Sequence, residues 1–175
     1  DVMLDFGGIA KGLIAQQVVQ FLQQWGPCLV DAGGDLVAGD PPQGQPGWAT
    51  GITAPLENGV AIRPNLARLW LHNGALMTSG VDYRHWPTTM GEQHHIIDPR
   101  VGVSAETDLL TVTVLAADAC QAEAWATATL VAGFEHGYAQ LLTHNIAAML
   151  VTRAKEIHIT PTFEPYLQLE SSLVR

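Results

Sequence analysis

The sequence predicts an α+β fold, in which a mixed sheet carries packed helices. Apolar residues recur with the two-residue period of strands in some stretches and with the period of helices in others. These stretches alternate irregularly, whereas strands and helices of a doubly wound sheet alternate regularly. Hydrophobic residues make up 47% of the chain and charged residues 14%, so a sizeable core is expected and disorder is not. The chain of 175 residues fits one domain, and residues 1–175 are expected to form a single unit.

The first elements are expected to be a strand end, a glycine turn and a helix. Val2 to Phe6 has the apolar character of a strand end, and Gly7-Gly8 interrupts it. Residues 9–25 place apolar side chains three and four positions apart, which predicts an amphipathic helix that Gly26-Pro27 ends. The apolar positions of this helix are Ile9, Leu13, Ile14, Val18, Phe21, Leu22 and Trp25.

The rest of the chain is expected to contain further strands and two more helices. Strands are predicted at residues 28–30, 48–52, 67–77 and 109–115. An alanine-rich helix is predicted at 118–132 and another helix at 134–143, and residues 147–152 and 156–159 indicate a closing hairpin. The sequence has no internal repeat and no low-complexity tract.

The charge balance excludes one class of partner. The formal net charge is −9, with only two lysines, Lys11 and Lys155, so no basic stripe is available to neutralise a nucleic acid. An acidic protein that binds a phosphorylated ligand must offset repulsion locally, through backbone N–H groups, a lone lysine or a divalent cation. No apolar run reaches the ~20 residues that a membrane span requires.

The two cysteines, Cys28 and Cys120, belong to no CxxC pair, so zinc and thioredoxin-type chemistry are poorly supported. Two buried free thiols are the favoured interpretation, and a disulfide is the alternative.

Two glycine-rich turns are candidate binding sites. In Asp5 to Gly12, glycines stand where a strand meets a helix, so the backbone can approach a ligand closely and the helix N-terminus can face an anion; Lys11 adds a positive charge. An ordinary tight turn with a solvent-exposed lysine is an equally weighted alternative. In Asp31 to Asp35, two carboxylates flank Gly33-Gly34, and this loop is either a metal or ribose site or a turn capped by aspartates.

A histidine pair opens the third candidate, His94 to Arg100. Neighbouring residues of a strand point to opposite faces, so the pair is not expected to bind one metal ion, and one histidine is expected to face a pocket. Asp98 precedes Pro99, which favours an extended backbone that fixes the direction of the carboxylate.

The fourth candidate lies in the alanine-rich helix, where Glu123 and Thr127 are four residues apart and share one face. A carboxylate and a hydroxyl on a face of small residues suit Mg²⁺ better than zinc. Taken alone, such a pair is more often solvated surface.

Together and in this order, these blocks resemble the ApbE family of FAD:protein FMN transferases. The matching blocks are Asp5 to Gly12, Ala32 to Asp35, Thr78 to Tyr83, His94 to Gly102 and Ala122 to Ala128. Two positions depart from the family pattern: Glu123 replaces an aspartate, and Val101 replaces a threonine. Family members carry a substantial N-terminal portion that contributes to the flavin site, and the start of this chain reads as an internal point of a longer polypeptide. The resemblance therefore implies an ApbE-like, T-fold-like mixed sheet, of which residues 1–175 form the C-terminal part.

The resemblance implies transfer of FMN from FAD to a threonine hydroxyl of a target protein, with release of AMP and a requirement for Mg²⁺. The implied metal ligands are the backbone carbonyl of Ala10 and the side chains of Glu123 and Thr127. His95 is the implied catalytic residue, either as general base or as electrostatic stabiliser.

The remaining implied roles concern FAD. The implied FAD-binding residues are Asp5, Gly7, Gly8, Lys11, Ser79, Ile97 and Asp98. Lys11 and the Gly7-Gly8 turn are expected beside the pyrophosphate. Ile97 and Asp98 are expected along the flavin pocket, and Asp35 in its wall. His85 and His94 are expected at the surface or behind the site.

Two alternatives stay open at this point: a non-catalytic protein that binds or stores FAD, and an enzyme that hydrolyses FAD to FMN and AMP. The implied acceptor is a redox-pump subunit. The implied location is the outer face of a bacterial inner membrane, as a lipoprotein, with a cytoplasmic location as the alternative.

Overall fold

A six-stranded antiparallel sheet forms the centre of the molecule. The computed structural model describes residues 4–57, 60–61, 65–89 and 91–167. The sheet has the strand order β1-β2-β7-β12-β13-β14, and every neighbouring pair is antiparallel. Its strands are β1 (Leu29–Asp31), β2 (Leu36–Ala38), β7 (Gly74–Gly80), β12 (Leu109–Ala116), β13 (Ala147–Thr152) and β14 (Ile157–Ile159).

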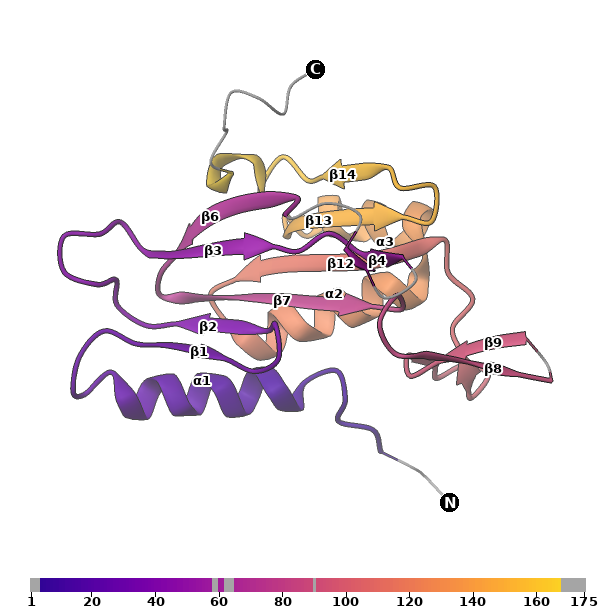
Figure 1. Ribbon diagram of the computed structural model, residues 1–175, viewed down its shortest axis with the longest axis horizontal. Coiled ribbons are helices and arrows are strands. Elements are labelled where there is room, and N and C mark those ends of the chain that lie inside the picture. Colours follow the sequence, from indigo (N-terminus) through magenta and orange to yellow (C-terminus); the bar gives the residue numbers. More distant parts are fainter. Residues whose placement is uncertain (1–3, 58–59, 62–64, 90, 168–175) are drawn as a thin grey trace.

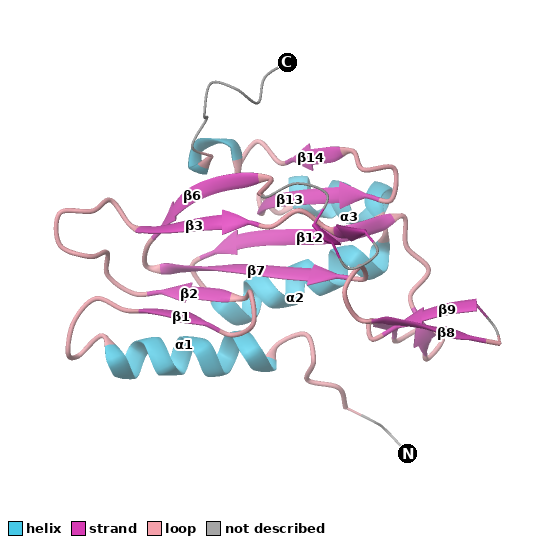
Figure 2. Ribbon diagram, viewed as in Figure 1, coloured by secondary structure: helices cyan, strands magenta, loops and turns pink. Residues whose placement is uncertain are grey.

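Three helices accompany this sheet: α1 (Ala10–Leu22), α2 (Ala119–Ala132) and α3 (Phe134–Thr143). Helix α2 packs against the two central strands, β7 and β12, and both other helices pack against α2 (Figure 2). Figure 1 shows α1 along the edge of the molecule, beside β1. None of the described helices has the length and continuous apolar character needed to cross a lipid bilayer.

The described residues form two hydrophobic clusters. The first lies between the sheet and the helices, and the second joins the sheet to an added strand pair, β3 (Trp48–Ile52) with β6 (Ala67–Leu71). Leu69 and Leu71 of β6 pack there with Phe163, and all three side chains are fully buried. Met149 and Val151 of β13 contribute from the sheet, so the sheet supplies side chains to both hydrophobic clusters of the molecule.

Short two-stranded ribbons complete the fold. They are β4 (Leu56–Glu57) with β5 (Val60–Ala61), β8 (His85–Thr88) with β9 (Gly91–His94), and β10 (Ile97–Asp98) with β11 (Val103–Ser104). A single turn of 3₁₀ helix, η1 (Glu164–Tyr166), follows the main sheet. Figure 1 shows the β8–β9 hairpin projecting from one end of the molecule.

The α+β class is confirmed, as are both later helices and the closing hairpin. Asp118 stands at the N-cap of α2, where its side chain accepts the backbone N–H of Gln121. The single strand expected at 67–77 is wrong, because a turn at Asn73, with φ of 44°, divides it into β6 and β7. In the expected strand end at Val2 to Phe6, residues 4–6 form no strand, and Val2 and Met3 lie outside the described residues.

Helix α1 packs through a different face from the one that its large side chains indicated. Its buried residues are Gly12, Ala15 and Val19, whereas the large apolar side chains that gave the helical pattern are exposed. The thiols of Cys28 and Cys120 are free, as expected, but they are only partly buried.

Candidate active site

The glycine turn and helix α2 meet at Gly12. A Cβ atom added to Gly12 would lie 2.6 Å from the carbonyl oxygen of Ala119, so only glycine lets the first turn of α1 approach α2 this closely. The N–H of Gly12 is one of the free donors at the start of a helix, and it donates to Oε2 of Glu123 at 2.7 Å. The side chain of Glu123 thus serves as a cap from another helix, 111 residues away in the sequence.

The second carboxylate oxygen of Glu123 has no such donor. Glu123 is 3% exposed, and its Oε1 is buried without a hydrogen-bond partner. The ammonium of Lys11 lies 4.0 Å from Oε1, beyond hydrogen-bonding distance. A buried carboxylate oxygen that accepts no hydrogen bond is costly, and Oε1 is therefore the oxygen of Glu123 that is available to a cation.

Lys11 is held by Asp35. The two side chains form an ion pair, in which Lys11 is half-exposed and Asp35 is 2% exposed. The other oxygen of Asp35 accepts the backbone N–H of Thr78 at 2.8 Å, which fixes the carboxylate against β7. The two aspartates of the second glycine turn therefore differ: Asp31 caps the turn by accepting the N–H of Gly34 at 2.7 Å, and Asp35 belongs to the cluster.

Thr127 lies one turn of α2 beyond Glu123 and connects it to β7. Its hydroxyl is hydrogen-bonded to the hydroxyl of Ser79 at 2.9 Å. A Cβ atom added to Gly8 would lie 3.3 Å from Oγ1 of Thr127, so Gly8 brings the turn directly against this side chain. Ala10 is the first residue of α1, between Gly8 and Gly12, and its role as a carbonyl ligand stays a prediction.

The turn itself is stabilised locally. Asp5 accepts the N–H of Gly7 at 2.7 Å, and the carbonyl of Phe6 accepts the N–H groups of Ile9 and Ala10 at 3.1 and 2.9 Å. The side chain of Asp5 is exposed. Lys11, Asp35, Ser79, Glu123 and Thr127 form what we call the Glu123 cluster. Asp5 shapes the turn from outside this cluster.

Within the described residues, no three His, Cys, Asp or Glu side chains gather closely enough to hold a metal ion. A cation beside Glu123 would therefore need mixed oxygen ligands, from the carboxylate, the Thr127 hydroxyl and the backbone. Such hard oxygen ligands suit Mg²⁺.

The histidine pair lies at the end of β9, and its two side chains have opposite environments. His94 is 5% exposed, with Nε2 3.0 Å from the carbonyl oxygen of Ala105 and Nδ1 buried without a partner. Burial lowers the pKa of His94, and the bond to Ala105 opposes this in part. The expectation that His94 lies at the surface or behind the site is wrong on the first count, because this side chain is the one that turns inward from the strand.

His95 is exposed, and its Nδ1 lies 3.4 Å from the carbonyl oxygen of Arg84. His85 is exposed, as expected, and its Nδ1 is hydrogen-bonded to Oε1 of Glu92 across the β8–β9 hairpin.

Asp98 is buried, and both of its carboxylate oxygens are hydrogen-bonded to Arg100. Both carboxylate oxygens accept from the Arg100 guanidinium, and Oδ1 also accepts the backbone N–H of Arg100 at 2.9 Å. These bonds lower the pKa of Asp98. This role of Arg100 was not predicted from the sequence, although the Asp-Pro-Arg spacing was a signal for it. Ile97, beside Asp98, is exposed.

Comparison with known proteins shows the family of the chain. The family model described as "ApbE family" matches residues 1–150. The chain belongs to the ApbE family.

Relatives and solved structures agree with this assignment. An FAD:protein FMN transferase of Klebsiella pneumoniae is 32% identical over 158 residues, which are 88% of this chain and 47% of that protein. One of Treponema pallidum is 35% identical over 150 residues, 80% of this chain and 41% of that protein. The crystal structure of the ApbE protein from Thermotoga maritima matches with a TM-score of 0.83 and 29% identity, over 96% of this chain and 54% of that one.

The apo form of the Pseudomonas stutzeri flavinyl transferase ApbE matches with a TM-score of 0.78 and 28% identity, over 95% of this chain and 52% of that one. These similarities confirm the ApbE-like fold. The chain spans about half the length of the curated relatives it matches.

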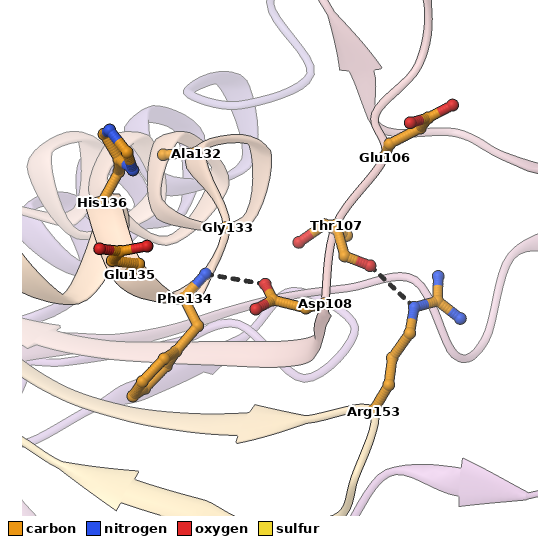
Figure 3. Close-up of a pocket in the computed structure, with 9 residues that line it drawn as sticks. All are labelled: Glu106, Thr107, Asp108, Ala132, Gly133, Phe134, Glu135, His136 and Arg153. Carbon is orange, nitrogen blue, oxygen red and sulfur yellow. Dashed lines mark hydrogen bonds between the residues drawn. The ribbon is translucent and has the colours of Figure 1, made fainter.

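Two cavities lie outside the Glu123 cluster. One of about 850 Å³ is lined by the β8–β9 hairpin, by His94 and by Arg153. The other, of about 550 Å³, lies at the start of α3, where Asp108 accepts the N–H of Phe134 at 2.8 Å and Arg153 donates to the carbonyl of Thr107 (Figure 3). Neither cavity is lined by Lys11, Glu123 or Thr127. The ApbE motif residues of α1 and α2 therefore form a cluster separate from both.

Proposed function

We propose that this ApbE-family chain takes part in the transfer of FMN from FAD to a threonine hydroxyl of a target flavoprotein, with release of AMP and with Mg²⁺ bound at Glu123 and Thr127. The names of its relatives support flavin transfer from FAD to a protein. The observation that carries the metal assignment is the buried Oε1 of Glu123, which accepts no hydrogen bond and lies 4.0 Å from the ammonium of Lys11. The acceptor is proposed to be a redox-pump subunit.

The residues present fit a magnesium ion. Glu123 offers Oε1, Thr127 offers its hydroxyl, and the turn offers a backbone carbonyl, for which Ala10 is the predicted donor and Gly8 the residue in contact with Thr127. When bound, Mg²⁺ supplies positive charge that offsets the two phosphates of FAD.

The chain's own residues position the pyrophosphate. The ammonium of Lys11 is kept beside Glu123 by Asp35, which is itself fixed by Thr78. The Gly7-Gly8 turn lets the backbone approach a phosphate without steric conflict from side chains. The exposed side chain of Ile97 and the fixed carboxylate of Asp98 are proposed to contact the flavin half, with Ser79 and Asp5 shaping the site from β7 and the turn.

His95 is proposed as the general base. If the proton of its imidazole lies on Nδ1, toward the carbonyl of Arg84, the lone pair is on Nε2. The threonine hydroxyl loses its proton to Nε2 as its oxygen forms a bond to the FMN phosphorus. The bond from that phosphorus to the bridging oxygen breaks, and AMP leaves with the electron pair.

The test is incubation of the intact protein with FAD, Mg²⁺ and a target domain that carries the acceptor threonine. The expected result is a mass gain of one FMN group on the target, accompanied by AMP. FAD binding without AMP would instead support a storage protein, and AMP without a mass gain would support hydrolysis of FAD.

The matched variant is Glu123→Gln, which keeps an oxygen for the Gly12 N–H but removes the negative charge. Mg²⁺ affinity, measured by calorimetry, and transfer are expected to fall at least about 100-fold, because a ligand charge is lost. Undiminished AMP production by this variant would contradict the metal assignment.

The proposed place of action is the outer face of a bacterial inner membrane. Cell fractionation tests this: the protein is expected with the membrane fraction, and recovery with cytoplasmic marker enzymes would contradict it.

A further inference from the structure

His95 lies in a bend between two short ribbons. Strand β9 ends at His94 and β10 begins at Ile97, so His95 and Ile96 connect the β8–β9 hairpin to the β10–β11 ribbon. Figure 1 shows the hairpin projecting from one end of the molecule. The direction of the His95 side chain therefore depends on how this bend is held.

Among the described residues, the imidazole of His95 makes one long hydrogen bond. Its Nδ1 lies 3.4 Å from the carbonyl oxygen of Arg84, whereas N–H···O bonds in proteins usually measure about 2.7–3.2 Å. The side chain is exposed, so packing adds little restraint. The position of the ring therefore depends mainly on the backbone of His95.

The residues on both sides of His95 are hydrogen-bonded to Ser104 and Ala105. The Ser104 hydroxyl accepts the backbone N–H of His94 at 3.0 Å and donates to the carbonyl of His94 at 2.6 Å. The Ala105 N–H donates to the carbonyl of Ile96 at 2.9 Å. The Ala105 carbonyl lies 3.0 Å from Nε2 of His94, which is the donor because a carbonyl only accepts. Four hydrogen bonds thus hold the chain directly before and after His95.

The Ser104 hydroxyl replaces the backbone of a neighbouring strand. It satisfies both the N–H and the C=O of one residue, as a facing residue of an antiparallel strand would. Ser104 is itself fixed, because it pairs with Ile97 in the β10–β11 ribbon. The side chain of Ser104 therefore ties the end of the β8–β9 hairpin to this ribbon, and of the other residue types only threonine carries a comparable hydroxyl.

We propose that Ser104 is a positioning residue for the transfer reaction, because its hydroxyl binds the backbone of His94 and so fixes the bend from which His95 reaches the acceptor hydroxyl. This inference rests on the proposed role of His95 in transfer. Ser104 takes no part in the proton transfer itself. A displacement of about 1 Å can slow a reaction about 100-fold, so a loosened bend should reduce the rate of transfer.

The kinetic test compares Ser104→Ala with Ser104→Thr, which keeps the hydroxyl. Ser104→Ala is expected to lower kcat for transfer about 10- to 100-fold, with KM for the target domain and Kd for FAD changed less than about twofold. Ser104→Thr is expected to restore most of kcat. The matched control is Val103→Ala, which changes the exposed neighbour of Ser104 in β11 and should transfer normally.

The second test needs no substrate. NMR three-bond couplings across the Cα–Cβ bond of His95 are expected to show a single χ1 rotamer in the unchanged protein and an average over rotamers in Ser104→Ala. Hydrogen exchange at the N–H of His94 is expected to be at least about tenfold faster in Ser104→Ala, because its acceptor is lost. Should Ser104→Ala fail to fold, Ser104→Cys, whose thiol forms weaker hydrogen bonds, replaces it.

Several results would overturn the proposal. These are an unchanged kcat in Ser104→Ala, a loss that appears in KM or in FAD affinity in place of kcat, and an equal loss in Val103→Ala. Averaged couplings of His95 in the unchanged protein would also overturn it. If the unchanged protein shows a single His95 rotamer but transfers no FMN, the proposed function fails while the positioning of His95 is supported, so the two failures are distinguishable.

Discussion

The two groups of motif residues are held in different ways. Around Glu123, the contacts join elements that are far apart in the sequence: Gly12 to Glu123, Lys11 to Asp35 and Ser79 to Thr127. Around His95, the contacts are local, such as Asp98 to Arg100 and His94 to Ser104.

This difference separates a fixed part of the site from an exposed part. The Glu123 cluster is part of how α1 packs on α2 and how the second glycine turn packs on β7, so its geometry is set by the fold itself. His95 and Ile97 stand at the surface beside short ribbons. Substitutions in the first group should therefore change stability and binding together, whereas substitution of the exposed His95 should change activity alone.

The largest expected effect is that of His95→Ala. Loss of a general base is expected to slow FMN transfer about 10²- to 10⁴-fold, while the melting temperature and FAD affinity stay unchanged because His95 is exposed. Single-turnover kinetics and calorimetry measure these quantities. The control His85→Ala removes another exposed histidine of the same region and should transfer normally. A matching loss of FAD binding in His95→Ala would make the residue structural.

Gly12→Ala tests the fixed part of the site. Its added methyl group would meet the Ala119 carbonyl at 2.6 Å and Oε2 of Glu123 at 3.0 Å. Overpacking of this kind is expected to cost about 1–3 kcal/mol of unfolding free energy, measured by urea denaturation, and to weaken Mg²⁺ binding at the same time. Gln17→Ala, on the exposed side of α1, is the control. A destabilised variant with normal Mg²⁺ affinity would show that packing and binding are independent.

Asp35→Asn is expected to have a smaller effect. Asparagine still accepts the Thr78 N–H, but the ion pair with Lys11 is lost. Because Lys11 is half-exposed, the loss of unfolding free energy should be about 1 kcal/mol or less, and it should shrink as salt is added. Urea denaturation at low and high ionic strength measures this. A loss that salt leaves unchanged would contradict the ion-pair explanation.

The smallest expected effect concerns His94 and pH. Burial lowers the pKa of His94 in the folded protein, so the unfolded chain binds the proton more readily. The resulting stability is fully present above the unfolded pKa of about 6.5 and is lost as the pH falls toward the lower folded pKa. His94→Gln should therefore lose less stability than the unchanged protein between about pH 7.5 and about pH 5, as followed by urea midpoints. His72→Gln, at an exposed position, should behave like the unchanged protein.

Local patterns in the sequence were sufficient for the long elements. The alanine-rich composition of residues 118–132 predicted α2, and α3 was predicted at its observed bounds of 134–143, since both helices carry their signals locally. The division of 67–77 at Asn73 was not predicted, because apolar character continues on both sides of the turn.

The candidate site residues were chosen by their motifs, but their partners depend on tertiary structure. No local signal indicates that Asp35 binds Lys11 while Asp31 caps a turn, or that Glu123 caps α1. The orientation of the histidine pair likewise depends on which side of β9 faces the cavity. His94 is buried on that side, so the surface position, one of its two expected environments, was wrong.

The two carboxylate oxygens of Glu123 differ in their hydrogen bonds, which affects how an ion could exchange at this site. One oxygen is tied to the backbone of α1 and the other has no bond to give up. The Mg²⁺ ion proposed at Glu123 would therefore bind and dissociate while both helices keep their positions. Binding should raise the free energy of unfolding with little change of structure. At a free ion concentration 100 times the Kd, the free energy of unfolding would rise by about 2.7 kcal/mol.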